Sequence, residues 1–320
     1  GNLVRLNAEK SIEIQRHLNS TITMSFDECI PYPYSYSDTK SSLKRSTKWT
    51  KRSLKAFKIK KGFGIFGIVQ GGMYKDLRKK SSEELSHMNF DGYAIGGLAV
   101  GEGHKLMSEV TLQILPNSSV IVLSGPNLAN EVAQNLPTAF VLSSVNNSNL
   151  NELGNLISNK NFRPYYNNDI VGTQLGGAVK NVIAIACGVT VARKLGENAR
   201  ASVITRGLQE IIYLGKKMGA NEKTFYGLSG IGDLNLTCNS EKSRNFKFGF
   251  NLGKGLSLKE IENMNFLAEG FYSCESVNSL ARKFGIDVPI CNAVKNLING
   301  CSIDKIIDKL LARPLQYEDI

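Results

Sequence analysis

Apolar and polar residues follow two alternating patterns in the first third of the chain. Short β-branched and apolar runs, which predict strands, are separated by longer amphipathic stretches, which predict helices. The predicted strands are Thr21–Phe26, Ile65–Val69 and Gly92–Ile95, the predicted helices are Asn7–Asn19, Ser42–Lys60 and Tyr74–Met88, and Pro31–Ser37 reads as a turn. Alternating strands and helices are typical of βαβ units, so we expect an α/β part containing a partial barrel or a parallel sheet.

The pattern changes near Lys105. Short elements are predicted first, at Leu106–Leu115, Val120–Leu123, Asn127–Asn135, Ala139–Ser143, Asn149–Ser158 and Phe162–Tyr166. Helical periodicity then dominates and predicts Ile170–Leu195, Asn198–Met218, Leu258–Asn263, Tyr272–Phe284, Cys291–Asn299 and Ile303–Leu311. We therefore expect an α/β fragment over residues 1–104, a sheet remnant over residues 105–166, and a mostly α-helical domain over residues 167–320.

The helical stretch Val171–Ala192 contains glycines at positions 172, 176 and 177. Glycine costs about 1 kcal/mol in a helix interior, so we expect another segment to pack closely against this backbone. Lys180 lies at the start of the apolar run, where partial desolvation would make it usable as an acid or base. The alternative is a core-helix lysine whose stem is buried and whose ammonium group reaches solvent.

Composition narrows the class of protein. The chain has 320 residues, 42% of them hydrophobic and 21% charged, which suits two domains of ordinary size. We identify no apolar run of the roughly 20 residues that span a bilayer, and so expect no membrane segment. The six cysteines lack C-x-x-C spacing and indicate reduced thiols. All three histidines precede residue 105, so we expect neither a metal site nor a His-based triad downstream.

The net charge of +11 is concentrated in one run. Lys40–Lys61 contains ten Lys and Arg residues and no acidic residue. Such a cluster can bind phosphates and gives salt-dependent affinity for nucleic acid. A solvated helix face is an equally good interpretation.

Polar and glycine residues follow each predicted strand of the first part. In parallel α/β folds, ligand-contacting groups lie at the C-terminal ends of strands. Those ends here are Asp27 with Cys29, Gln70–Gly72 and Gly96–Ala99. A carboxylate, a carboxamide and glycine-exposed backbone together suit the edge of a purine-like base.

Five strings carry a family resemblance over about residues 3–104: EKSIEIQRHL, SFDECIPYP, RSTKWTKRS, FGIVQGGMYKDLR and FDGYAIGGLAVGE. On these motifs the first part resembles the bacterial tRNA-guanine (queuine) transglycosylases. The resemblance implies weak tRNA binding through Lys40–Lys61, and base recognition by Asp27, Cys29, Gln70, Gly97 and Leu98. The family's two essential aspartates and its Cys/His zinc site have no counterpart in this sequence.

The segment Gly62–Gly67 fits the dinucleotide fingerprint G-x-G-x-x-G. That fingerprint should follow a strand and open a helix. Here it follows a basic run and enters the predicted strand Ile65–Val69. We therefore reject it as a nucleotide site.

Several polar groups of the second part suit a phosphorylated substrate. Arg244 offers a planar fork for a phosphate, and the Ser124–Asn127 turn offers backbone N–H donors. The glycine-rich segment Gly227–Leu234, interpreted as a turn, presents Asp233, which could position an ammonium group. Taken singly, these features are as consistent with a helix cap, a loop turn or a surface arginine. Together with Lys180 they favour a site with a lysine acid/base.

Seven strings carry a second resemblance, over about residues 105–315: LSGPNLANEV, LPTAFVLSS, GGAVKNVIAIACGV, NARASVITRGLQEI, FYGLSGIGDLNLTC, SEKSRNFKFGFNLGKG and AEGFYSCESV. On these the chain resembles NAD(P)-dependent glycerol-3-phosphate dehydrogenase of the bacterial type, whose helical domain is 6-phosphogluconate-dehydrogenase-like. The resemblance makes Lys180 the catalytic proton acceptor or donor. It implies substrate binding by Gly125, Asn127, Asp233, Ser243, Arg244 and Asn245, and cofactor contacts by Ala129, Arg244 and Glu269. Asn127 stands where the family has serine.

The dehydrogenase family begins with a Rossmann unit, and the transglycosylase-like fragment stands in its place. We interpret the chain as a chimera joined near His104–Val110. Because the glycine turn for a pyrophosphate is lost, we expect weak binding of NAD or NADP and little hydride transfer. A base- and tRNA-binding fragment and an inactive fusion product are the alternatives. The sequence leaves the oligomeric state open, a homodimer included.

Overall fold

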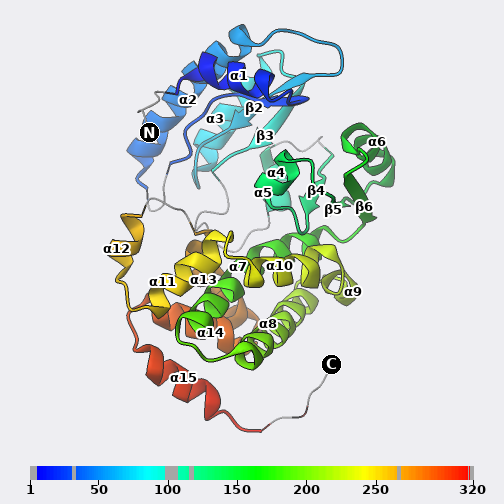
Figure 1. Ribbon diagram of the computed structural model, residues 1–320. Helices are drawn as coiled ribbons and strands as arrows, with labels where there is room; N and C mark the ends of the chain where they lie inside the picture. The colour runs from blue at the N-terminus through cyan, green and yellow to red at the C-terminus, as the bar shows by residue number, and fades with distance from the viewer. Residues whose placement is uncertain are drawn as a thin grey trace. The chain divides into compact units, whose positions relative to one another are not determined.

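The computed structural model describes residues 6–30, 34–97, 107–114, 119–264, 268–315 and 317 (Figure 1). The chain divides into two compact units. The first comprises Gly1–Glu102 and Val110–Asn117, and the second comprises Gly103–Glu109 and Ser118–Ile320. Of the predicted join at His104–Val110, residues 104–106 lie outside the described residues.

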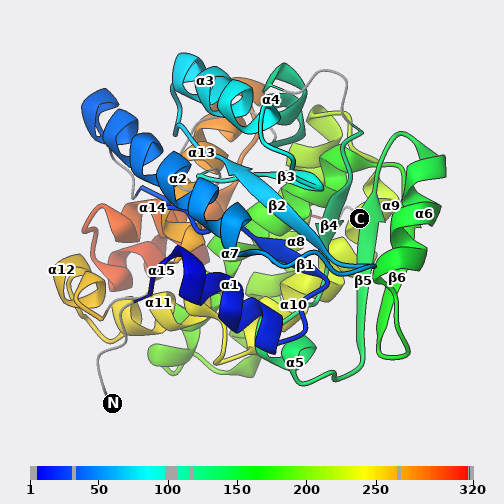
Figure 2. The same cartoon turned by 90° about the horizontal axis from the view of Figure 1, so that it is seen from above.

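The first unit is built on a three-stranded parallel sheet with the order β1-β2-β3. Its elements are α1 (Ala8–His17), β1 (Ile22–Met24), α2 (Tyr36–Ala56), β2 (Gly64–Val69), α3 (Lys75–Ser86) and β3 (Gly92–Ile95). Figure 2 shows the three strands side by side with α2 and α3 next to them. Sequential parallel order is what consecutive βα units produce, so the predicted α/β class is confirmed. The fingerprint Gly62–Gly67 runs into β2, as expected for a chance match.

Helix α2 begins at Tyr36, six residues before its predicted start. Ser35 is the N-cap and its hydroxyl accepts from the N–H of Asp38 at 3.1 Å. This cap satisfies one of the free donors of the first turn. The predicted turn Pro31–Ser37 was therefore wrong at its last two residues.

The second unit begins with a mixed sheet of the order β4-β5-β6. Its elements are β4 (Val122–Ser124), α5 (Ala129–Ala133), β5 (Thr138–Ser143), α6 (Asn147–Ile157) and β6 (Phe162–Asn167). Helix α4 (Met107–Ile114) comes before them in the chain and is divided between the two units at Val110. β4 pairs antiparallel with β5, and β5 pairs parallel with β6. Phe140 and Phe162 stack with ring centroids 4.0 Å apart and form the centre of a small core.

The rest of the second unit is helical. It comprises α7 (Ile170–Ala192), α8 (Glu197–Lys217), α9 (Glu222–Phe225), the π-helical turn η1 (Leu228–Gly232), α10 (Asp233–Asn239), α11 (Arg244–Gly253), α12 (Leu258–Glu262), α13 (Glu269–Phe284), α14 (Pro289–Ile298) and α15 (Ile303–Leu311). α7 is the central helix, and α8, α10, α11, α13 and α14 pack against it (Figure 1). The sequence predicted most of these helices but missed α9 and α10, which are short, and α11, which contains two glycines.

Helix α7 corrects the prediction that no segment could span a membrane. By length and composition its 23 residues qualify, with a mean hydropathy of 1.7 over 18 residues. In the structure 61% of that window is buried, because α7 is the core around which the other helices pack. Apolar residues all around a helix are expected when every face is covered.

Glycines allow α7 and α11 to approach closely. A Cβ at Gly249 of α11 would lie 1.9 Å from the carbonyl oxygen of Ile185, and one at Gly188 would lie 2.1 Å from that of Phe246. Neither distance is sterically possible, so both positions require glycine. The close packing inferred from the glycines of α7 is therefore present, and it extends further along the helix than predicted.

Candidate functional site

Lys180 and Asp233 form an ion pair in the second unit. Lys180 lies midway along α7 and its side chain is 18% exposed, whereas the side chain of Asp233 is 4% exposed. Asp233 is the first residue of α10, and its backbone carbonyl accepts from the Thr237 hydroxyl at 2.7 Å. The two residues that the sequence singled out 53 positions apart are thus in direct contact.

The π-helical turn η1 places Asp233 against α7. The N–H of Gly232 donates to the carbonyl of Gly227 at 3.2 Å, and Gly230 has non-helical backbone angles. A Cβ at Gly176 of α7 would lie 2.3 Å from the carbonyl oxygen of Ser229, so this glycine lets η1 lie directly on the helix. The segment Gly227–Leu234, predicted as a simple turn, is instead a π-helical turn that continues into α10.

Gly125 contacts the Lys180–Asp233 pair through its backbone N–H. Burial raises the pKa of Asp233, while Lys180 and a hydrogen bond from the Gly125 backbone N–H oppose that rise. Gly125 lies in the β4–α5 loop with φ +127°, a conformation that favours glycine. A lysine, a buried carboxylate and a backbone donor therefore meet at one point.

The start of α11 holds three predicted site residues. Ser243 is the N-cap, and its hydroxyl accepts from the Phe246 N–H at 3.2 Å, which is the structural role considered for it. Arg244 is 56% exposed and pairs with Glu269, the first residue of α13. Asn245 is buried, and its carboxamide oxygen accepts from the Gly270 N–H at 2.8 Å. Arg244 is thus the member of this group with the most freedom to meet a ligand.

Asn181 is a site residue that the sequence reasoning missed. Its side-chain oxygen accepts from the Asn245 side chain at 3.0 Å, which joins α7 next to Lys180 to the start of α11. The sequence signal that could have identified Asn181 is its polar side chain directly after Lys180, at the start of an apolar run. Through Asn245, Asn181 links the Lys180–Asp233 pair to the Arg244–Glu269 pair.

The β4–α5 loop is tied to the same region. Lys242, two residues before Arg244, pairs with Glu131 of α5 at 2.8 Å. Ala129, predicted to touch the cofactor, is exposed at the start of α5, and Asn127 is partly buried in the loop before it. The predicted substrate and cofactor residues of the second unit therefore all belong to segments that meet around α7 and α11.

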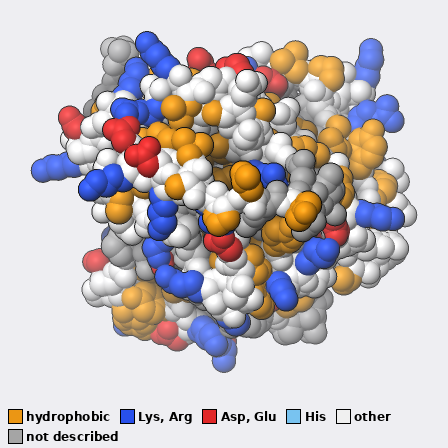
Figure 3. Space-filling view, turned by 90° about the horizontal axis from the view of Figure 1, so that it is seen from below, with side chains coloured by type: hydrophobic (Ala, Val, Ile, Leu, Met, Phe, Trp, Pro, Cys, Tyr) orange, Lys and Arg blue, Asp and Glu red, His pale blue; other side chains and the backbone are white. Residues whose placement is uncertain are grey.

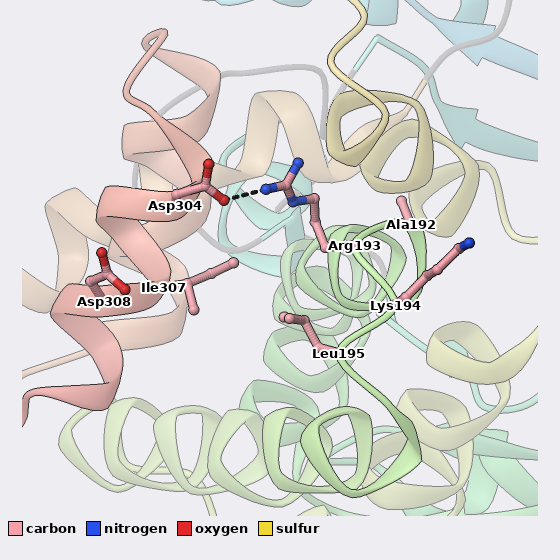
Figure 4. A pocket seen from close by; sticks show the side chains of 7 residues that line it. All are labelled: Ala192, Arg193, Lys194, Leu195, Asp304, Ile307 and Asp308. Atoms are coloured by element: carbon pink, nitrogen blue, oxygen red, sulfur yellow. Dashed lines mark hydrogen bonds and ion pairs between the residues drawn. The ribbon is translucent and has the colours of Figure 1, made fainter.

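One cavity in the second unit lies away from Lys180. It has a volume of about 310 Å³ and is lined by the end of α7 and by α15, where Arg193 pairs with Asp304 (Figure 4). Thirteen residues of helix separate Arg193 from Lys180, which is about 20 Å along the axis. Figure 3 shows one face of the molecule, on which Lys and Arg side chains are scattered among apolar ones. Lys180 is not among the residues that line the cavity.

The first unit brings together two of its predicted base-reading residues. The Gln70 side-chain amide donates to Asp27 Oδ2 at 2.5 Å, so the ends of β1 and β2 meet as expected. Burial raises the pKa of Asp27, opposed by the Gln70 hydrogen bond. A cavity of about 270 Å³ in this unit lies near the start of β1 and contains neither residue.

Helix α2 holds the Asp27 loop in place through hydroxyl groups. The N–H of Phe26 donates to Ser53 Oγ at 2.9 Å, and the N–H of Glu28 donates to Ser46 Oγ at 3.0 Å. Of the other predicted base-reading residues, Cys29 is exposed, Gly97 has φ +63°, and Leu98 lies outside the described residues. Among the described residues, no group of three or more His, Cys, Asp or Glu is placed to hold a metal ion.

Comparison with known proteins bears on both units. Residues 169–308 match the family model of the NAD-dependent glycerol-3-phosphate dehydrogenase C-terminus, and residues 1–136 match that of queuine tRNA-ribosyltransferase. The solved glycerol-3-phosphate dehydrogenase of Coxiella burnetii is 30% identical with a TM-score of 0.70, covering 95% of this chain and 89% of that one. The chain belongs to the glycerol-3-phosphate dehydrogenase family.

Curated relatives agree with this assignment for about two thirds of the chain. The glycerol-3-phosphate dehydrogenase (NAD(P)+) of Parvibaculum lavamentivorans is 46% identical over 217 residues, and that of Zymomonas mobilis is 44% identical over 218. These matches cover 67% and 68% of this chain and 65% and 64% of the relatives. The chain thus spans about 65% of the length of these glycerol-3-phosphate dehydrogenases, and its first part matches a second family.

Proposed function

We propose that the second unit is the substrate half of a glycerol-3-phosphate dehydrogenase, acting on glycerol 3-phosphate or dihydroxyacetone phosphate. The observation that carries this is the Lys180–Asp233 pair beside the Gly125 N–H. Lys180 would donate a proton to the carbonyl oxygen of dihydroxyacetone phosphate, or accept one from the hydroxyl of glycerol 3-phosphate. Asp233 would hold the ammonium group toward the substrate.

Arg244 supplies the phosphate contact in this proposal. Its guanidinium is planar and can bind two phosphate oxygens at once, which lysine cannot do. The exposed ion pair with Glu269 holds the Arg244 guanidinium at the site until a substrate phosphate replaces the Glu269 carboxylate.

The six cysteines form no disulfide, which supports a reducing, cytoplasmic compartment.

The described residues do not fit a nicotinamide dinucleotide. Such a cofactor needs a glycine-rich turn between a strand and a helix to hold its pyrophosphate. The G-x-G-x-x-G segment of this chain lies at the start of β2 instead, and Gly71 and Gly72 after β2 pack against Arg78 and Tyr34. We therefore assign no step of the reaction to a bound nicotinamide.

Titration with NADH or NADPH is expected to show dissociation constants weaker than about 1 mM, because the pyrophosphate contacts are lost. The measurement is nicotinamide fluorescence at 25 °C, with an intact glycerol-3-phosphate dehydrogenase as the positive control. Saturation in the micromolar range would show that another part of the chain replaces the lost unit.

The first unit supports a second candidate function, binding of a purine-like base and of tRNA. The contact between Asp27 and Gln70 at the ends of adjacent strands favours the base. For the nucleic acid, five exposed lysines form one stripe along α2, spaced every three or four residues: Lys40, Lys44, Lys48, Lys51 and Lys55. In the described part of the chain the ion pairs of α2 use Arg45 and Arg52 and leave these lysines unpaired. The stripe is about 23 Å long.

Two variants separate the candidates. Lys44→Glu/Lys48→Glu should weaken tRNA binding by about tenfold or more and reduce the salt slope by about 2, since two phosphate contacts are lost. Lys180→Ala should leave tRNA binding unchanged and abolish whatever reduction of dihydroxyacetone phosphate the wild-type chain carries out with added millimolar NADH or NADPH as the hydride donor. Lys79→Glu/Lys80→Glu changes the charge equally on α3 and is the control. Equal tRNA affinity in both double variants would argue against the stripe.

A further inference from the structure

Arg78 connects the ends of two strands in the first unit. It lies in the second turn of α3 and is 3% exposed. Its Nε donates to the carbonyl of Gly72 at 2.5 Å, and its two terminal nitrogens donate to the carbonyls of Gly96 and Gly97 at 3.1 Å each. One buried guanidinium thus joins the segment after β2 to the segment after β3.

The same glycines lie against the Gln70 side chain. A Cβ at Gly96 would be 2.4 Å from Gln70 Nε2, and one at Gly97 would be 2.8 Å from Gln70 Oε1. The carboxamide therefore lies directly on the Gly96–Gly97 backbone, and any shift of that backbone moves Gln70 or collides with it. Gln70 is also fixed through its own N–H, which donates to Ser81 Oγ at 3.0 Å.

The direction of the Gly96–Gly97 peptide follows from its bond to Arg78. In a planar trans peptide the N–H points opposite to the carbonyl. Because the Gly96 carbonyl is directed at the guanidinium, the Gly97 N–H is directed away from it. Arg78 thus sets which backbone group the end of β3 presents to a ligand.

We propose that Arg78 is the positioning residue of a site for a guanine-like base formed by Asp27, Gln70 and the Gly96–Gly97 backbone. This rests on the second candidate function. The ligand is a planar heterocycle with two adjacent N–H donors, and a carboxylate can accept a hydrogen bond from each of them. A lysine in place of Arg78 keeps the charge but cannot donate along three fixed directions, so it cannot hold the same geometry.

The single tryptophan of the chain reports on this site. Trp49 of α2 packs on Phe26, the neighbour of Asp27, with ring centroids 5.1 Å apart. Titration of the full chain with guanine, and separately with adenine, is followed by Trp49 fluorescence excited at about 295 nm. The variants are Arg78→Lys and, as the matched control, Arg45→Lys, since Arg45 is half exposed and pairs with Glu28 beside Asp27.

The wild-type chain and Arg45→Lys should bind guanine more tightly than adenine. Arg78→Lys should bind guanine about tenfold or more weakly and lose most of the selectivity. Because buried carbonyls lose donors in this variant, its melting temperature is measured first and the titration is run well below it. Because a purely structural role would lower the melting temperature and leave the guanine-to-adenine ratio of the folded protein unchanged, the ratio is the deciding measurement. Unchanged selectivity in Arg78→Lys overturns the role of Arg78 alone, whereas no guanine binding by the wild type overturns the base site itself.

Discussion

Raising the pH from 4.5 to above 7 should lower the unfolding free energy of the wild-type chain by about 3 kcal/mol through one carboxyl group, Glu210. Glu210 lies on α8, is 4% exposed, and accepts from the backbone N–H groups of Ile290 at 2.6 Å and Cys291 at 3.0 Å. The Glu210 carboxyl group therefore caps the N-terminus of α14. Burial raises its pKa from 4.5 to about 7, and the two N–H donors oppose this only in part.

The direction of this pH dependence follows from which state, folded or unfolded, keeps the Glu210 proton. Between pH 4.5 and about 7 the unfolded chain has lost the Glu210 proton and the folded chain has kept it. Protons therefore favour the folded state, and the stabilisation present below pH 4.5 is lost as the pH rises through about 7.

The measurement is urea unfolding of the wild type and of Glu210→Gln at several pH values. The stability difference between them should change across this pH window, because glutamine does not titrate. Glu260→Gln is the control: its carboxylate is exposed in a capping box with Ser257, and its pKa is lowered, so it does not titrate in this window. Parallel curves for the wild type and Glu210→Gln would contradict the prediction.

Gly249→Ala should destabilise the second unit by about 3 kcal/mol or more. The added Cβ would lie 1.9 Å from the backbone carbonyl oxygen of Ile185, and neither helix can yield without separating α7 from α11. The intrinsic helix preference for alanine, about 1 kcal/mol, acts in the opposite direction and is outweighed.

Gly232→Ala is the matched control for this substitution. Gly232 has helical backbone angles of −60° and −50°, and its Cβ would have no neighbour closer than 3.6 Å. Thermal unfolding followed by circular dichroism should show a large loss for Gly249→Ala and little change for Gly232→Ala. Comparable melting temperatures in the two variants would show that the α7–α11 contact tolerates a methyl group.

The sequence predicted those features that depend on local pattern. Strands β2 and β3, helix α7 and the contact partners Asp27 and Gln70 follow from periodicity and from the rule that parallel strands end at one edge. Lys180 and Asp233 were assigned to one site because a carboxylate can position an ammonium group. Helix α10 was missed because it is short and follows the glycine-rich turn η1, and α11 was missed because it contains two glycines. Both helices pack against α7.

Arg78, Asn181 and Glu210 could not be predicted, because their partners are identified only by the tertiary structure. Arg78 was an unremarked charge in an amphipathic helix, and its burial depends on carbonyls six, eighteen and nineteen residues away. Asn181 bonds to a residue 64 positions along the chain, and Glu210 to residues 80 and 81 positions along. No periodic pattern encodes such pairs.

The buried core around α7 has a consequence for how this chain arose. Its fully buried members run from Leu175 to Val294, so every one of them belongs to the second unit. A rearrangement that exchanged the coding sequence upstream of the second unit would leave all the residues of this core in place. The helical part could therefore be carried into new contexts as a transferable module.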